Sequence, residues 1–196
     1  NLDEFFMVRV ASLKDQVHAG YKKKDIAGMT SEEQLKEISR QTHELVKVQY
    51  NTFNRSVLPA LEKTGLHLIA EHENLNQKQQ EFVDRYFEDN VYPVLTPMAM
   101  DSSRPFPLIR NKTLNIGALI AKKNNKKHTK ELEFATVQVP SVLPRFILLP
   151  QDEKTGQRYV ILLEEIIERN IGKLFLSYDV VCAHPYRVMR NADLSI

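Results

Sequence analysis

The sequence predicts an α+β fold: an N-terminal antiparallel helical segment followed by a mixed domain with a mainly antiparallel sheet and flanking helices. Up to about residue 65, apolar residues recur at steps of three and four, which is typical of amphipathic helices. From Leu114 the period changes to two, which indicates half-buried strands. Short polar segments join these strands, as in antiparallel hairpins. We therefore expect a helical domain at residues 1–65 and an α+β domain at residues 66–196.

The composition is that of a globular protein with a packed core. Hydrophobic residues make up 42% of the 196 residues and charged residues 27%, and the formal net charge is only +2. This balance gives no support to nucleic-acid binding. Apolar runs such as Tyr159–Leu163 fall far short of the roughly 18–20 residues that cross a bilayer, so no membrane span is predicted. The single cysteine, Cys182, suits core packing in a reducing compartment. We expect a cytoplasmic protein, with peripheral membrane attachment as the alternative.

Two helices are predicted in the first domain. The first is N-capped by Asn1 and ends at Gly20. The second begins at Thr30 or Ser31, where Glu33 or Gln34 completes a capping box. It carries a long apolar stripe and should pack antiparallel on the first helix. Pro59 lacks a backbone donor, so we expect a kink or break near Leu58 before the helix ends at Gly65.

The second domain begins with a third helix, capped by Asn74 or Asn76 and ending before Pro93. The proline-rich stretch Val94–Ile109 is interpreted as an ordered loop. Two hairpins, a short helix and a last strand should follow, at 114–120 with 132–139, 145–149 with 159–163, about 164–175, and about 186–189.

No catalytic or metal-binding signature is visible. The sequence contains no phosphate-binding loop of the G-x-x-x-x-G-K type, no G-x-G-x-x-G and no H-E-x-x-H. The six histidines are scattered without the spacing of metal ligands. We therefore assign no catalytic residue and no metal ligand to this chain.

Two basic segments are candidates for binding anions. The segment Lys122–Lys130 holds five lysines, which would attract a polyanion or simply form a solvated hairpin tip. Arg104 lies in a loop stiffened by Pro105 and Pro107, where it would contact phosphate or pair with Asp101. Both alternatives stay open for each segment.

Three segments carry a resemblance to a known family. They are Asn1-Leu2-Asp3-Glu4-Phe5-Phe6-Met7-Val8-Arg9, the stretch Val94–Pro107 with its Asp101-Ser102-Ser103-Arg104-Pro105-Phe106-Pro107, and Arg190-Asn191-Ala192-Asp193-Leu194. In this order they resemble the N-terminal helical domain and head domain of bacterial-type, histidine-phosphorylating polyphosphate kinases. Met189 departs from the threonine that is common there.

The resemblance implies an enzyme that reversibly transfers the terminal phosphate of ATP to polyphosphate through a phosphohistidine, with Mg²⁺. The catalytic histidines would lie outside this chain, so the chain alone is expected to be inactive and to bind no cofactor. Asn1 would contribute to the nucleotide site, although it could equally serve only as a helix cap. The head domain would support a homo-oligomer.

Two other function classes remain as alternatives. A stand-alone scaffold or oligomerisation module would use the long helix to bind a partner. A polyanion-binding module would use the lysine-rich hairpin. The chain opens on Asn1 without a methionine and stops at Ile196, so we expect further sequence on both sides.

Overall fold

The computed structural model describes residues 1–100, 108–123, 132–151 and 156–192. The chain forms two compact units, one made of residues 1–59 with 189–196 and the other of residues 60–188. The division after Pro59 falls within the last stretch of helix, a few residues before the expected boundary at residue 65.

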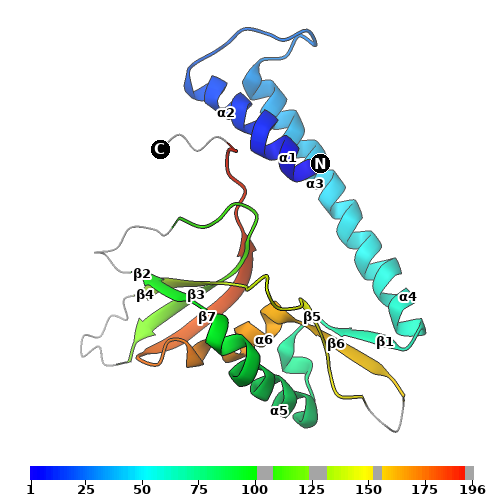
Figure 1. Ribbon diagram of the computed structural model, residues 1–196. Helices are drawn as coiled ribbons and strands as arrows, with labels where there is room; N and C mark the ends of the chain where they lie inside the picture. The colour runs from blue at the N-terminus through cyan, green and yellow to red at the C-terminus, as the bar shows by residue number, and fades with distance from the viewer. Residues whose placement is uncertain (101–107, 124–131, 152–155, 193–196) are drawn as a thin grey trace. The chain divides into compact units, whose positions relative to one another are not determined.

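The first unit is an antiparallel helical pair. Its first helix consists of α1 (Leu2–Phe5), a π-helical turn (Phe6–Val10) and α2 (Ala11–His18), and it packs antiparallel on α3 (Ser31–Thr52) (Figure 1). The predicted capping box is confirmed, because the Thr30 hydroxyl accepts from the Glu33 amide while Glu33 accepts from the Thr30 amide. Asn1 precedes α1, but its side chain makes no capping hydrogen bond.

The second helix does not break at Pro59. It changes to a π-helical turn at Phe53–Val57 and resumes as α4 (Leu58–Lys63). The wider turn re-routes the backbone hydrogen bonds just before the proline, which lacks its own donor. Three apolar side chains in the later part of α3 stay open to solvent, with exposed fractions of 60–63%: Leu45, Val48 and Tyr50.

The second unit contains two sheets. The larger is antiparallel, in the order β2 (Pro97–Met100), β4 (Leu132–Gln138), β3 (Leu114–Lys122) and β7 (Tyr178–Arg187). The smaller has the order β1 (Leu66–Ile69), β6 (Arg158–Leu162) and β5 (Phe146–Leu148), with β1 parallel to β6. The predicted hairpins β3–β4 and β5–β6 are confirmed.

Two predictions about strands are wrong. The supposed loop at Val94–Ile109 contains β2, and the last strand extends over Tyr178–Arg187 instead of beginning near residue 186. Both β2 and β7 are edge strands that contain a proline, Pro97 or Pro185. An edge strand tolerates proline because one side of its backbone has no ladder partner. Cys182, in β7, is only half-buried.

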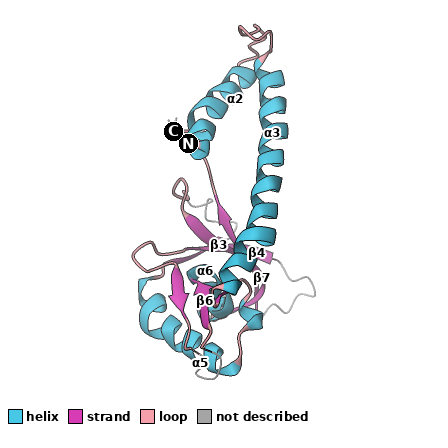
Figure 2. Ribbon diagram, turned by 90° about the vertical axis from the view of Figure 1, so that its right-hand side faces the viewer, coloured by secondary structure: helices cyan, strands magenta, loops and turns pink. Residues whose placement is uncertain are grey.

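Helices α5 (Gln77–Tyr86) and α6 (Leu163–Asn170) complete the core of this unit. A capping box between Asn76 and Gln79 begins α5. Helix α6 contacts β3, β6 and β7 and lies between the strands of the two sheets (Figure 1 and Figure 2). The most deeply buried residues come from the helices and both sheets: Val83, Phe87, Val91, Ile116, Ile120, Val137, Ile161, Ile166 and Ile167.

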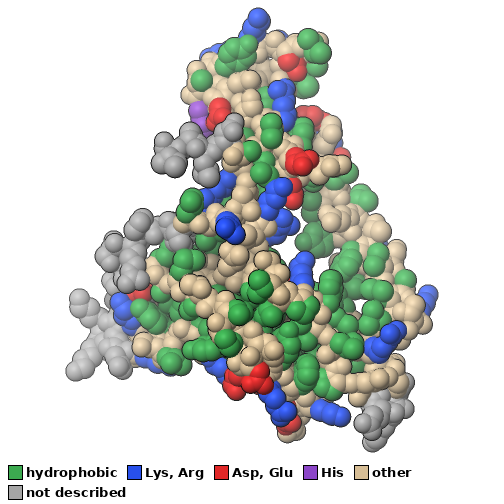
Figure 3. Space-filling model, in the orientation of Figure 1, with side chains coloured by type: hydrophobic (Ala, Val, Ile, Leu, Met, Phe, Trp, Pro, Cys, Tyr) green, Lys and Arg blue, Asp and Glu red, His purple; other side chains and the backbone are tan. Residues whose placement is uncertain are grey.

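Some apolar side chains of this unit remain on its surface, where green side chains are visible in Figure 3. On the edge strand β5, Phe146 is 65% exposed and Leu148 is 60% exposed, while Ile147 between them is buried. The strand thus presents an apolar face to solvent as well as one to the core.

Candidate functional site

The structure describes few of the residues singled out from the sequence. Asn1 is exposed, and its backbone oxygen accepts a hydrogen bond from the Phe5 amide at 3.0 Å. Arg104 lies outside the described residues, as does most of the lysine-rich segment, residues 124–130. The nucleotide role of Asn1 and the phosphate role of Arg104 therefore stay predictions.

The first and last of the quoted segments do come together. The Ala192 amide donates to the Met7 carbonyl at 3.0 Å. A hollow of about 200 Å³ lies beside them in the helical unit, between α2 and residues 189–191, and its polar lining includes Lys14, Asp15 and His18. Asn1 is not among its lining residues.

A larger hollow, of about 520 Å³, lies at one end of the four-stranded sheet. We call it the basic hollow, because four of its lining residues are cationic and none of the described residues that line it is acidic. The four are Arg110, Lys112, Arg145 and Arg187. Its remaining walls come from Thr113 and the first residue of β3, the last residue of β4, residues 139–141, Leu143 and the first residue of α6.

A tight turn places the first two cations. The Thr113 amide and hydroxyl both donate to the Arg110 carbonyl, at 3.3 and 2.8 Å, and the buried Asn115 amide group donates to the Thr113 carbonyl at 3.0 Å. Lys112, the third residue of this turn, has a φ of 64°. A positive φ at this position favours glycine or asparagine, so a lysine here holds a strained backbone.

The end of β7 holds the turn in place. Arg187 is paired with Leu114 in the sheet, and its Nε donates to the Lys112 carbonyl at 3.1 Å. The Lys112 amide in turn donates to the Val188 carbonyl at 2.9 Å. Both backbone groups of Lys112 are therefore bound to the β7 segment, which fixes where its side chain starts.

The fourth cation is paired. Arg145 forms an ion pair with Glu164 on α6, and its Nε lies 3.1 and 3.2 Å from the two carboxylate oxygens. The Glu164 side chain is only 5% exposed, whereas that of Arg145 is 57% exposed. Hydrogen bonding to Glu164 raises the pKa of Arg145. Arg145 thus neutralises a buried carboxylate while it faces the hollow.

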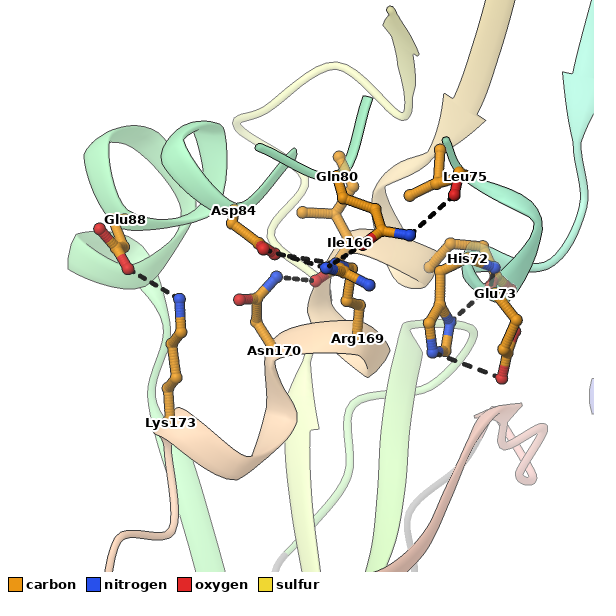
Figure 4. A network of polar contacts seen from close by, with 11 residues as sticks. His72, Glu73, Leu75, Gln80, Asp84, Glu88, Ile166, Arg169, Asn170 and Lys173 are labelled. Atoms are coloured by element: carbon orange, nitrogen blue, oxygen red, sulfur yellow. Dashed lines mark hydrogen bonds and ion pairs between the residues drawn. The ribbon is translucent and has the colours of Figure 1, made fainter. Parts of the chain in front are cut away.

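The other polar cluster of this unit joins α5, α6 and the turn at His72–Asn74 (Figure 4). Arg169 binds both carboxylate oxygens of Asp84, at 2.8 and 3.0 Å, and Lys173 binds Glu88 at 2.7 Å. The hydrogen bond from Arg169 lowers the pKa of Asp84. Each cation of this cluster is paired with a carboxylate, and the ion pairs hold the two helical segments together.

His72 belongs to this cluster and has a carboxylate near each of its ring nitrogens. Its Nδ1 lies 3.2 Å from Glu165 and its Nε2 lies 3.5 Å from Glu73, and the side chain is 18% exposed. The His72 backbone amide also donates to Glu165, at 3.1 Å. Glu165 therefore fixes the turn to α6, and both ring nitrogens face carboxylates, which favours a structural role.

The described residues include no group of three histidine, cysteine, aspartate or glutamate side chains that could hold a metal ion. The Mg²⁺ expected in the complete enzyme stays a prediction. No helix among the described residues is both long and apolar enough to cross a membrane.

The basic hollow was not predicted from the sequence, where the candidate anion-binding residues were a run of lysines and an arginine in a proline-rich loop. Its cations come from three segments that meet only in the folded chain. The one local signal was the pair Arg110 and Lys112, two residues apart directly before a predicted strand.

Comparison with known proteins covers both units. Residues 1–69 match the family model described as the polyphosphate kinase N-terminal domain, and residues 78–196 match the polyphosphate kinase middle domain. The chain is 52% identical to a polyphosphate kinase of Lactiplantibacillus plantarum and 46% identical to one of Bacillus anthracis, over its whole length in both cases. It spans only 26% and 28% of those relatives.

A solved structure is similar as well. The crystal structure of polyphosphate kinase from Porphyromonas gingivalis matches the whole chain with a TM-score of 0.83 at 25% sequence identity, over 28% of that protein. The match includes the helical unit and the mixed unit, in agreement with the α+β fold predicted from the sequence.

Proposed function

This chain belongs to the polyphosphate kinase family, and on that premise we propose that it is the non-catalytic N-terminal and middle part of an enzyme that reversibly transfers the terminal phosphate of ATP to polyphosphate. The observation that carries the proposal is the identity of 52% over the entire chain to a relative named polyphosphate kinase. The transfer would pass through a phosphohistidine on residues outside the chain.

The chemistry of the described residues supports a binding role. The basic hollow offers cations suited to phosphate groups. His72 has a carboxylate beside each ring nitrogen and is largely buried, so it is poorly placed to accept a phosphoryl group from a bulky nucleotide. We therefore expect the chain to help hold substrates and to transfer no phosphate by itself.

Nucleotide and metal binding belong to the same proposal. Asn1 would contact ATP through an amide that both donates and accepts, and its exposure and lack of a capping hydrogen bond leave that amide available. Mg²⁺ would neutralise phosphate charge during transfer, on ligands outside the described residues. A cytoplasmic location fits these substrates.

We also propose that the mixed unit supports a homo-oligomer. The edge strand β5 supports this, because Phe146 and Leu148 expose apolar surface beside an unpaired strand edge. Light scattering on the chain and on a Phe146→Lys variant would test it. A larger mass that falls in the variant is expected, and a monomeric chain would contradict the idea.

The central test compares the 196-residue chain with the complete product of its gene. Each is incubated with ATP labelled on its terminal phosphate, Mg²⁺ and a polyphosphate primer. We expect labelled polymer and an acid-labile phosphohistidine from the complete product, and neither from the chain alone. Absence of polymer from the complete product would refute the enzymatic proposal, and transfer by the chain alone would refute the placement of the histidine.

A further inference from the structure

We propose that the basic hollow is a binding site for a linear polyphosphate chain, with Arg110, Lys112 and Arg187 contacting successive phosphate groups. The inference rests on the proposed function, because it assigns a place on this chain to the polymer substrate. It concerns only residues of the mixed unit and involves neither Asn1 nor the histidines.

Size and charge are the first argument. The hollow has a volume of about 520 Å³, within the roughly 300–1,000 Å³ typical of ligand sites. Glu164 compensates Arg145, and no carboxylate of the described residues forms an ion pair with Arg110 or Lys112. The like charges of Arg110 and Lys112 repel each other, and a polyanion would relieve that repulsion.

The backbone of Lys112 is the second argument. A turn with a φ of 64° would be formed more easily by glycine or asparagine, yet a lysine is held there. Its amide and carbonyl are both bound to the β7 segment, so the strain is maintained by the fold. Strain kept at a cationic residue that lines a hollow points to a functional requirement for that charge.

The lining also selects among anions. None of the described lining residues is aromatic, so the hollow lacks the stacking surfaces on which single-stranded nucleic acids bind. The two guanidinium groups assigned to the polymer, those of Arg110 and Arg187, come from separate segments, and a guanidinium can bind a phosphate through two parallel hydrogen bonds. Repeated phosphates on a narrow, base-free backbone fit this arrangement best.

The test is equilibrium binding of the 196-residue chain to fluorescently labelled inorganic polyphosphate. Wild type is compared with the double variant Arg110→Gln/Lys112→Gln and with Lys126→Gln/Lys127→Gln, which removes the same charge from the lysine-rich segment. We expect the first variant to lose affinity by roughly tenfold or more, and the second to lose less than about threefold. Orthophosphate at equal phosphate concentration should not compete.

The proposal fails if wild type does not bind, if both variants lose affinity equally, or if the lysine-rich segment accounts for the loss. Lys112→Asn guards against misfolding, since asparagine accepts a positive φ. It should keep or raise the melting temperature while weakening binding. If the Lys112→Asn variant binds polyphosphate as tightly as wild type, the assignment of Lys112 to the polyphosphate site is wrong.

A kinetic test separates this inference from the proposed function. In the complete gene product, Arg110→Gln/Lys112→Gln should raise KM for polyphosphate several-fold and leave KM for ATP unchanged. An active product whose KM for polyphosphate does not change would refute the site and leave the enzymatic function standing. A wild-type product without transfer activity would refute the function, and binding to the isolated chain would still decide on the site.

Discussion

Two clusters of cations in the same unit differ in how many of their charges are paired with carboxylates. Between α5 and α6 and the turns that follow them, Arg169 binds Asp84 and Lys173 binds Glu88, so these charges are satisfied within the protein. In the basic hollow, four cations share a lining whose described residues include no acid; Arg145 pairs with Glu164 from outside that lining, and Arg110 and Lys112 have no carboxylate partner among the described residues.

The difference shows which charges serve folding. A paired cation between two helices stabilises their packing, and its removal leaves a carboxylate without its partner. A cation in an open hollow adds repulsion to the folded state, so folding alone would not retain it. The contrast predicts that substitutions of the two kinds will affect stability by different amounts, and in some cases with opposite sign.

Arg145→Met should have the largest effect on stability, although Arg145 lines the basic hollow. It would leave Glu164 buried without a partner, which we expect to reduce the free energy of unfolding by about 2–3 kcal/mol, below the full value for a buried pair because Arg145 is half in solvent. Urea denaturation followed by circular dichroism would measure it. The double variant Arg145→Met/Glu164→Leu should recover most of the loss, and no recovery would contradict the pairing argument.

Asp84→Asn should reduce the free energy of unfolding by about 1–2 kcal/mol at pH 7, because it removes the bidentate contact to Arg169. The pKa of Asp84 is lowered in the folded state, so its contribution is present above the ordinary value of 3.8 and is lost as pH falls through the folded value. Thermal unfolding at pH 7 and below pH 3 would show the variant and wild type converge in acid. A constant difference across that range would show that the ion pair is not the cause.

The fold was largely predictable where one physical signal dominated. The capping box at Thr30, an asparagine cap at residue 74 or 76 and the alternation along β3 and β4 indicated their elements correctly. The two missed strand segments are proline-containing edge strands, where the usual rule against proline in sheets does not apply. The parallel pairing of β1 with β6 could not be predicted locally, because some ninety residues separate the two strands.

The candidate site was much less predictable. Arg110 and Lys112 are adjacent to a strand, but Arg145 and Arg187 join them only through the sheet register and the start of α6. The positive φ of Lys112 leaves no mark in the sequence, since the residue type argues against it. A run of cations is visible in the sequence, so the lysine-rich segment was predicted as the candidate anion-binding region instead.

Lys112→Asn should change stability in the opposite direction. Asparagine adopts a positive φ more readily than lysine, and the substitution removes one charge from the hollow. We expect the free energy of unfolding to rise by about 0.5–1 kcal/mol. Denaturant unfolding would measure the gain, with Lys22→Asn, in the exposed loop before α3, as the control. A destabilised Lys112→Asn variant would mean that the lysine side chain itself supports the turn.

Arg110→Gln should have the smallest effect on stability. Arg110 is exposed and forms no ion pair among the described residues, so its side chain contributes little to packing. Its positive charge is repelled by those of Lys112 and Arg187, which line the same hollow. The free energy of unfolding should therefore change by less than about 0.5 kcal/mol, towards greater stability, and the gain should shrink as salt screens the repulsion. Unfolding curves at low and high ionic strength would measure it, with Arg169→Gln as the contrasting variant that destabilises at both. If Arg110→Gln destabilised as much as Arg169→Gln, the charges of the hollow would belong to the folding network and the distinction between the two clusters would be lost.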